Sequence, residues 1–157
     1  MNSLSINILA AIATTCLLVS CVAVNTQPDM GEVRFGLMHR AENGELELVR
    51  ETLTIPLKLR DPDYAFGYVY CPNHTNEYRI HDISYMPSSP TTLSGEISIL
   101  PVGSATKGLK TPEYTMHGVH QMEYWFDEGD PLGNYRIDVV VNDHRVRSIR
   151  FKVVQDK

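Results

Sequence analysis

Beyond residue 30, apolar and polar residues alternate along the chain in short runs, a pattern typical of β-strands with one buried face. Two runs near the C-terminus show this alternation most clearly. Their apolar positions are Tyr135, Ile137, Val139 and Val141 in the first run and Ile149, Phe151 and Val153 in the second. Asn142 and Asp143 separate the two runs and predict a hairpin turn. No stretch beyond residue 30 keeps a helical period for more than about ten residues, so this part of the chain is restricted to an all-β fold.

Further runs predict strands over residues 31–40, 45–59, 65–71, 78–86, 95–102 and 120–126. In the run 45–59 the alternation changes register near residues 49–52, which predicts a β-bulge or a strand that passes from one sheet to another. Asn43 and Gly44 come before this run and predict a hairpin turn, because both residues tolerate positive φ. Residues 103–112 are rich in Gly, Ser, Thr and Lys, and we expect a loop there.

About seven or eight short strands separated by turn signals predict an antiparallel β-sandwich, with another antiparallel barrel as the alternative. Residues 130–137 resemble the start of strand F in immunoglobulin-like domains, where a turn ending in Gly precedes a Tyr that hydrogen-bonds back to the corner. Tyr135 has the position of that Tyr, and Ile137 stands where antibody domains have a disulfide cysteine. The resemblance implies an immunoglobulin-like sandwich over residues 31–157.

Most of residues 31–155 also resemble a bacterial domain family of unknown function that has this fold. The matching segments are residues 51–56, 66–67, 124–127 and 133–151. These segments consist of turn and core residues. The resemblance therefore implies the fold and brings no catalytic residues with it.

The N-terminal segment predicts export from the cytoplasm. Residues 2–20 carry no charged side chain, and their roughly 14 apolar residues suit a signal-peptide core but are fewer than the roughly 20 that a membrane-spanning helix needs. Leu18-Val19-Ser20-Cys21 follows this core and resembles the lipobox of bacterial lipoproteins. The resemblance implies cleavage before Cys21 and a diacylglyceryl group on its sulfur. An ordinary secretory signal and an uncleaved N-terminal anchor are the alternatives.

The lipobox divides the chain into a signal peptide (residues 1–20), a tether (21–30) and the sandwich domain (31–157). Two or more acyl chains bind a membrane durably, and the tether spans about 30 Å when it is extended. Val22, and not Asp, follows Cys21. By analogy with the sorting of Gram-negative lipoproteins, this favours the outer membrane, with the domain facing the periplasm.

The net charge of −5 lies entirely beyond residue 20. Nucleic acid and anionic lipid both bind surfaces that are rich in Lys and Arg. Because this protein is acidic, we expect neither as a partner. Of the three cysteines, Cys16 leaves with the signal peptide and Cys21 carries lipid, which leaves Cys71 without an intrachain partner. Cys71 is either a buried structural thiol or, with His74 close in sequence, a reactive one.

Two segments are weak candidates for metal binding. His117 and His120 point to opposite faces of a strand unless a tight turn at Gly118 brings them together, and zinc needs further ligands such as His74, His81 or Cys71. Asp127, Glu128 and Asp130 offer oxygen ligands for calcium, but their spacing is not that of an EF-hand loop. Solvated or structural side chains are the alternative in both places, and we predict no metal or cofactor.

The sequence contains no signature of catalysis. Gly-x-Ser-x-Gly, His-Glu-x-x-His and phosphate-binding glycine loops are absent. Glu96, Glu123 and Asp138 alternate with apolar residues, and we expect them to point outward. We therefore predict that the protein is not an enzyme.

A set of aromatic residues is the remaining candidate site. Trp125, Tyr124, Tyr68 and Tyr70 could form a recognition surface, since exposed aromatic rings are enriched at interface hot spots. Packing in the core is the alternative for the same residues. Trp125 shares its face with Gln121, Glu123 and Asp127, which predicts that Trp125 is exposed and that Phe126 is buried.

These features predict a cell-envelope lipoprotein that acts as a non-catalytic protein-binding or assembly module for an envelope protein. The alternative is a small periplasmic enzyme inhibitor or immunity protein. Such a protein would block its target with a rigid, protruding loop formed by residues 72–77 or 103–112.

Substituting Cys21→Ala tests the predicted anchor, because it removes the only sulfur that a lipobox enzyme would modify. We expect the variant to leave the membrane fraction and to lose the mass of the acyl chains, as measured by fractionation and mass spectrometry. The substitution Cys71→Ala is the control and should leave the protein membrane-bound. A Cys21→Ala protein that stays in the membrane fraction would rule out the lipobox.

Overall fold

The structure is a computed structural model that describes residues 31–42, 44–58, 64–73, 76–89, 98–102 and 106–156. The predicted signal peptide, Cys21 and the tether lie outside these residues, as do His74 and Glu96. The described residues include no helix with the length and apolar character needed to cross a membrane.

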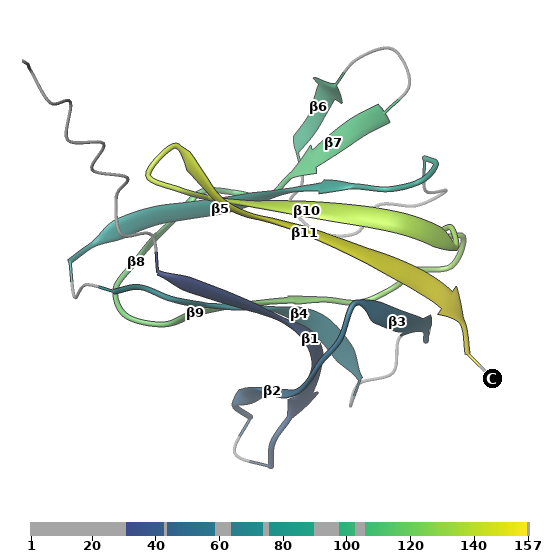
Figure 1. Ribbon diagram of the computed structural model, residues 1–157, viewed down its shortest axis with the longest axis horizontal. Helices are drawn as coiled ribbons and strands as arrows, with labels where there is room; N and C mark the ends of the chain where they lie inside the picture. Colours follow the sequence, from purple (N-terminus) through teal and green to yellow (C-terminus); the bar gives the residue numbers. More distant parts are fainter. Residues whose placement is uncertain are drawn as a thin grey trace, which may run out of the picture.

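The described residues form eleven strands in two sheets, which lie one above the other as two layers (Figure 1). The smaller sheet has the order β2-β1-β4-β9, and the larger has the order β3-β11-β10-β5-β7-β6, with β8 paired to β5. The bounds of the strands are β1 Glu32–Arg40, β2 Leu46–Glu51, β3 Thr54–Leu57, β4 Ala65–Cys71, β5 Tyr78–Tyr85, β6 Ser98–Val102, β7 Thr106–Lys110, β8 Tyr114–Met116, β9 His120–Tyr124, β10 Gly133–Val141 and β11 His144–Gln155. The predicted all-β sandwich is confirmed.

Three details differ from the sequence prediction of seven or eight antiparallel strands. The short strand β8, which pairs with β5, was not predicted. Residues 106–110 of the expected loop form β7, because β5 and β6 flank this segment and provide backbone hydrogen-bond partners on both sides. Leu109 is the buried residue of this strand and faces Ser84 of β5. The pairing of β3 with β11 is parallel, whereas the other pairs are antiparallel.

The register change near residues 49–52 has both of the predicted forms. Leu37 and Met38 of β1 pair with Arg50 and Leu48, so Val49 is an extra, bulged residue of β2. The chain then passes from the smaller to the larger sheet, where Ile55 of β3 is fully buried and pairs with Val153. This crossing closes one side of the sandwich.

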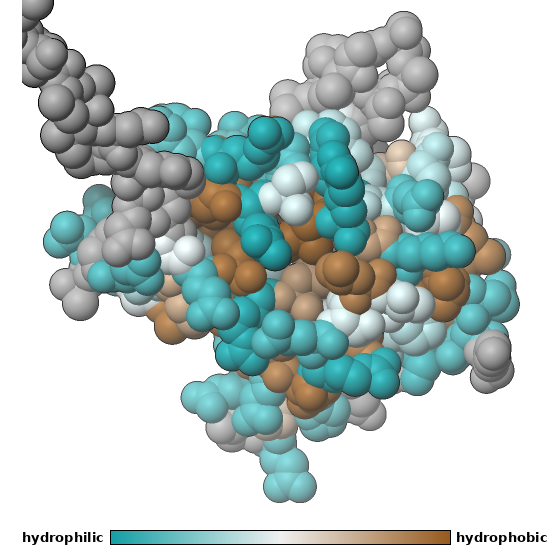
Figure 2. Space-filling model, viewed as in Figure 1, coloured by the Kyte–Doolittle hydropathy of each residue, from teal (hydrophilic) through white to brown (hydrophobic). Residues whose placement is uncertain are grey.

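The core lies between the sheets and is rich in aromatic rings. Phe66 of β4 stacks on Phe126 with ring centroids 4.7 Å apart, and Phe35 of β1 packs on Phe151 of β11 at 4.8 Å. Apolar side chains remain visible along the middle of the molecule, between hydrophilic residues above and below (Figure 2). The alternation in the sequence therefore corresponds to burial between two layers.

The predicted tyrosine corner is present before β10. The Tyr135 hydroxyl donates a hydrogen bond of 2.6 Å to the carbonyl oxygen of Pro131, four residues earlier. Gly133 between them has a φ of +135°, a backbone conformation that residues other than glycine rarely adopt. This corner sets the start of the β10–β11 hairpin. The predicted turn at Asn142 and Asp143 is present, and both residues have positive φ.

Strand register defines two ends of the sandwich. Glu32 at the start of β1 pairs with Cys71 at the end of β4, and we call this end the N-terminal pole. Phe66 near the start of β4 pairs with Tyr124 at the end of β9. We call this opposite end, which also contains the start of β10, the distal pole (Figure 1).

Candidate functional site

The predicted aromatic surface is wrong for Tyr68 and Tyr70. These side chains are 0% and 1% exposed, because alternate residues of β4 place them on the same face as Phe66, toward the core. Tyr124 also faces inward, with its ring 5.5 Å from that of Phe66 and its hydroxyl buried. Sequence alternation alone does not distinguish the inner from the outer face of an aromatic strand.

Trp125 is the member of this set that lies on the surface, as its alternation with Phe126 predicted. Trp125 is 52% exposed, whereas Phe126 is buried in the core. Leu132, at the start of the same hairpin, is 47% exposed. Both residues lie at the distal pole, so an exposed aromatic side chain marks the end of the sandwich opposite the start of β1.

The two candidate histidines do not meet. His120 is buried, its Nε2 atom has no hydrogen-bond partner among the described residues, and burial lowers the pKa of His120. His117 is exposed, with Nε2 3.4 Å from a carboxylate oxygen of Glu77. Gly118 has the positive φ expected of a turn, and its carbonyl oxygen accepts a hydrogen bond from the Tyr78 hydroxyl. No group of three or more metal-ligating side chains occurs among the described residues.

The acidic turn at the distal pole is closed by its own hydrogen bonds. The Asp127 amide donates to the Asp130 carboxylate at 2.9 Å, and the Asp130 amide donates to the Asp127 carbonyl at 3.1 Å. Asp127 is buried, and burial raises the pKa of Asp130. These contacts give the Asp130 carboxylate a structural role in the turn.

Two further sequence predictions have mixed outcomes. Cys71 is half-buried and forms no disulfide in the described part of the chain. Glu123 points outward and pairs with Arg40 at 2.6 Å, as expected of a surface carboxylate. Asp138 also lies on the outer side of its strand, as expected, although it is only 4% exposed. Arg136 and Arg145 lie 3.4 and 3.7 Å from its oxygens and help to shield it.

A buried polar cluster inside the sandwich was not predicted. Asp82 of β5 is fully buried, with the hydroxyl groups of Thr111 and Tyr68 at 3.2 and 3.4 Å from its Oδ2 atom. Burial raises the pKa of Asp82 to about 6, and hydrogen bonding by Tyr124, Thr111 and Tyr68 opposes this rise. Asp82 occupies an inward position in an alternating strand where the sequence would normally have an apolar residue, and that position was the available signal.

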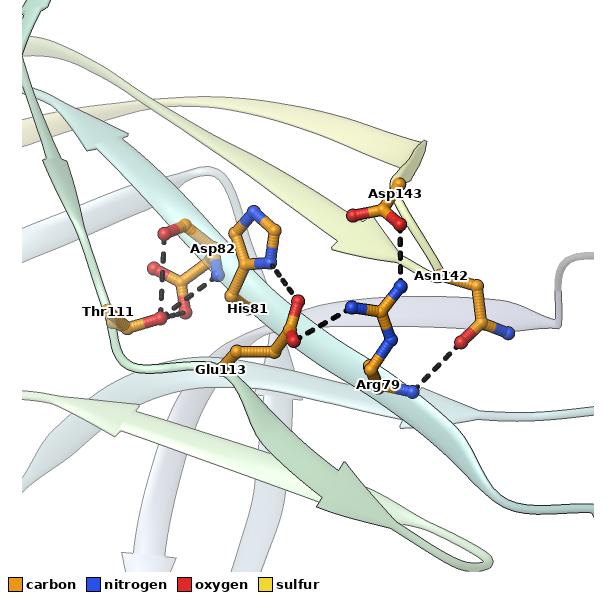
Figure 3. A network of polar contacts seen from close by, with 7 residues as sticks. All are labelled: Arg79, His81, Asp82, Thr111, Glu113, Asn142 and Asp143. Carbon is orange, nitrogen blue, oxygen red and sulfur yellow. Dashed lines mark hydrogen bonds and ion pairs between the residues drawn. The ribbon is translucent and has the colours of Figure 1, made fainter.

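Next to this cluster, charged side chains join three segments at the N-terminal pole (Figure 3). Arg79 of β5 contacts Glu113 at 3.0 Å and Asp143 at 2.6 Å, while its amide donates to the Asn142 side chain at 2.9 Å. His81 lies 3.6 Å from the other oxygen of Glu113, and burial is the main cause that lowers the pKa of His81. These contacts attach the β10–β11 turn to β5 and indicate a structural network.

A groove of about 610 Å³ opens on the outer face of the larger sheet, toward the distal pole. Its lining includes one cross-strand row, in which Tyr85 of β5 pairs with Arg136 of β10 and Arg136 pairs with Arg150 of β11. The Arg136 guanidinium carbon lies 3.8 Å from the centre of the Tyr85 ring, within the range of a cation–π contact. The sequence could not predict this row, because it depends on the register of three strands.

The carboxyl group of Asp82 predicts a specific pH dependence. The unfolded chain releases this proton near the ordinary value of 3.8, whereas the folded protein releases it near 6. The stability that the protonated Asp82 carboxyl group gives the folded protein is therefore lost as the pH rises through this interval. We therefore compare the free energies of unfolding of Asp82→Asn and the wild type by urea denaturation. As the pH rises from about 4 to about 7, we expect this free energy to shift in favour of Asp82→Asn by up to about 3 kcal/mol.

The exposed Asp156 provides the matched control for this measurement. The stability of Asp156→Asn should follow that of the wild type across the same pH range. If the curve of Asp82→Asn also stayed parallel to that of the wild type, Asp82 would not be held protonated in the folded state.

Comparisons with known proteins agree with this architecture. A search of curated proteins found no match. An immunoglobulin-like protein from Pseudomonas aeruginosa has a similar structure, with a TM-score of 0.54 and 18% sequence identity, over 79% of this chain and 93% of that chain. This likeness shows the immunoglobulin-like fold. The sequence pattern of the PM0630 beta sandwich domain matches residues 33–154, and the chain belongs to this family.

Proposed function

We propose that the protein is a cell-envelope lipoprotein, anchored through Cys21, whose sandwich is a non-catalytic protein-binding or assembly module. The observation that carries this proposal is the exposure of Trp125 at the distal pole. Trp is among the residues most enriched at interface hot spots, because a large apolar ring gains much from burial against a partner.

The position of Trp125 supports a role in contacts away from the membrane. From Phe66 to Cys71, β4 advances about 17 Å between the two poles. The described chain begins at the N-terminal pole, and a tether of about 30 Å would keep that pole near the lipid. The distal pole would then face outward, where a protein partner has access to it.

The distribution of polar groups supports a non-catalytic role. Asp82 is sealed between the sheets, and His81 belongs to a network of ion pairs that joins strands. The groove on the larger sheet is lined by guanidinium, amide, aromatic and thioether groups, with no nucleophile beside a general base. Acid–base or nucleophilic catalysis needs such groups to converge on a substrate.

The alternative, an enzyme inhibitor or immunity protein, has one observation in its favour. The β6–β7 hairpin extends away from the two layers of the sandwich (Figure 1), as a blocking element would. In that case the partner would bind the hairpin, and binding would not depend on Trp125.

Affinity capture from envelope extract tests the proposed surface. We expect the tagged wild-type protein to retain a specific envelope protein and Trp125→Ala to lose most of it, since truncation of a hot-spot residue costs about 2 kcal/mol or more. The readout is quantitative mass spectrometry of the retained proteins.

The control is Val49→Ala, because Val49 is a similarly exposed apolar residue on the edge strand β2. This variant should retain the partner as the wild type does. Recovery of no specific protein would count against a binding module. Equal recovery with Trp125→Ala would reject the Trp125 surface and favour the β6–β7 hairpin.

A further inference from the structure

We propose that the groove over Tyr85, Arg136 and Arg150 binds an extended acidic peptide through its carboxylate groups. The inference rests on the proposed function in two respects, namely that the partner is a protein and that the distal pole faces away from the membrane. The site itself is argued from the geometry and charge of the outer face of the larger sheet.

Arg136 is held in position before any ligand arrives. Its guanidinium group lies over the Tyr85 ring at 3.8 Å, and its Nε atom is 3.4 Å from the Asp138 carboxylate. Asp138 is itself fixed by a 2.7 Å hydrogen bond from the Ser148 hydroxyl. The two terminal nitrogens of Arg136 have no hydrogen-bond or ion-pair partner in the part of the chain that the structure describes. They are the atoms that bind carboxylates in bidentate pairs.

The pairing of Arg136 with Arg150 points to an anionic ligand. The two residues are directly opposite each other on neighbouring antiparallel strands, and like charges in that arrangement destabilise a sheet. Arg150 is exposed and forms no ion pair among the described residues. Asp138 contacts Arg136 and leaves the charge of Arg150 uncompensated. A bound anion would relieve this repulsion.

The spacing of the cations fits an extended peptide. Arg150 and Lys152 lie on the same face of β11, about 6.8 Å apart along the strand, and Lys152 pairs with Asn134 of the groove. An extended acidic peptide that runs along β11 presents alternate carboxylates at the same interval. Tyr85 and Met86 add an apolar wall for the aliphatic parts of its side chains.

The surroundings favour carboxylates over a lipid surface. The protein has a net charge of −5, so this row is a local patch and not part of a generally basic surface that would attract phosphate groups. The groove is lined by residues at the distal half of β5 and β10. In the proposed orientation, this half faces away from the membrane that holds the anchor.

Fluorescence anisotropy with the full-length protein in detergent tests the site. The probe is a labelled peptide of alternating glutamate and threonine, and the same peptide with glutamine in place of glutamate is the uncharged control. We expect saturable binding of the glutamate peptide only. Arg136→Met and Arg150→Met should each weaken binding about tenfold or more, since charge-assisted hydrogen bonds are lost.

Two variants separate geometry from overall charge. Arg147→Met removes the same charge from an exposed arginine of β11 that does not line the groove, and it should change affinity less than twofold. Arg136→Lys keeps the charge but loses the planar group that stacks on Tyr85, and it should bind as weakly as Arg136→Met. Thermal unfolding of each variant checks that the fold is intact. If Arg136→Met does not fold, the loss of binding in Arg150→Met tests the groove instead.

Three results would overturn the inference. They are no binding of the glutamate peptide, a loss of affinity in Arg147→Met equal to that in the groove variants, or preferential binding to phosphatidylglycerol vesicles or inorganic phosphate. The proposed function stands separately. If the Trp125 surface captures a protein but the glutamate peptide does not bind, only the groove is rejected. If the peptide binds and nothing is captured, the failure lies with the Trp125 surface.

Discussion

The packing of aromatic rings across the sandwich is the interaction on which the rest of the structure depends. Phe66 contacts Phe126 of the segment that follows β9, and Phe35 and Phe151 from facing sheets complete the cluster. The described residues contain no disulfide, so apolar burial has to hold the two sheets face to face. Because the rings fix which face of each strand points inward, they also determine which side chains form the outer face and the two poles.

Several elements of this fold could be predicted because their signals are local. Alternation identified β10 and β11, the Asn142-Asp143 turn and the exposed side of Trp125, and the Gly133–Tyr135 spacing identified the corner. Other features depend on strands that are distant in the sequence. β7 was missed because its Lys and Gly residues carry little strand signal, and its pairing with β5 and β6 decides its conformation. Tyr68 and Tyr70 were misassigned because an aromatic residue suits both a core and an interface.

The candidate sites show the same division more strongly. In the sequence, Arg136 and Arg150 are two polar residues within alternating runs, and their proximity to Tyr85 appears only once the register is known. Asp138 lies on the outer face, as expected, but Arg136 and Arg145 cover it. The cation row, the stacked tyrosine and the buried carboxylate are thus products of the sheet, whereas the proposed lipobox is a linear motif that can be recognised without a fold.

The central claim is that the sandwich meets its partner with the distal pole while the N-terminal pole faces the membrane. Photocrosslinking in intact cells tests it most directly, with a photoreactive amino acid placed at Leu132 of the distal pole or at Val119 of the N-terminal pole. Both side chains are exposed. The account predicts a discrete protein adduct from position 132 and none from position 119. A protein adduct from position 119 alone, or equal adducts from both positions, would contradict it.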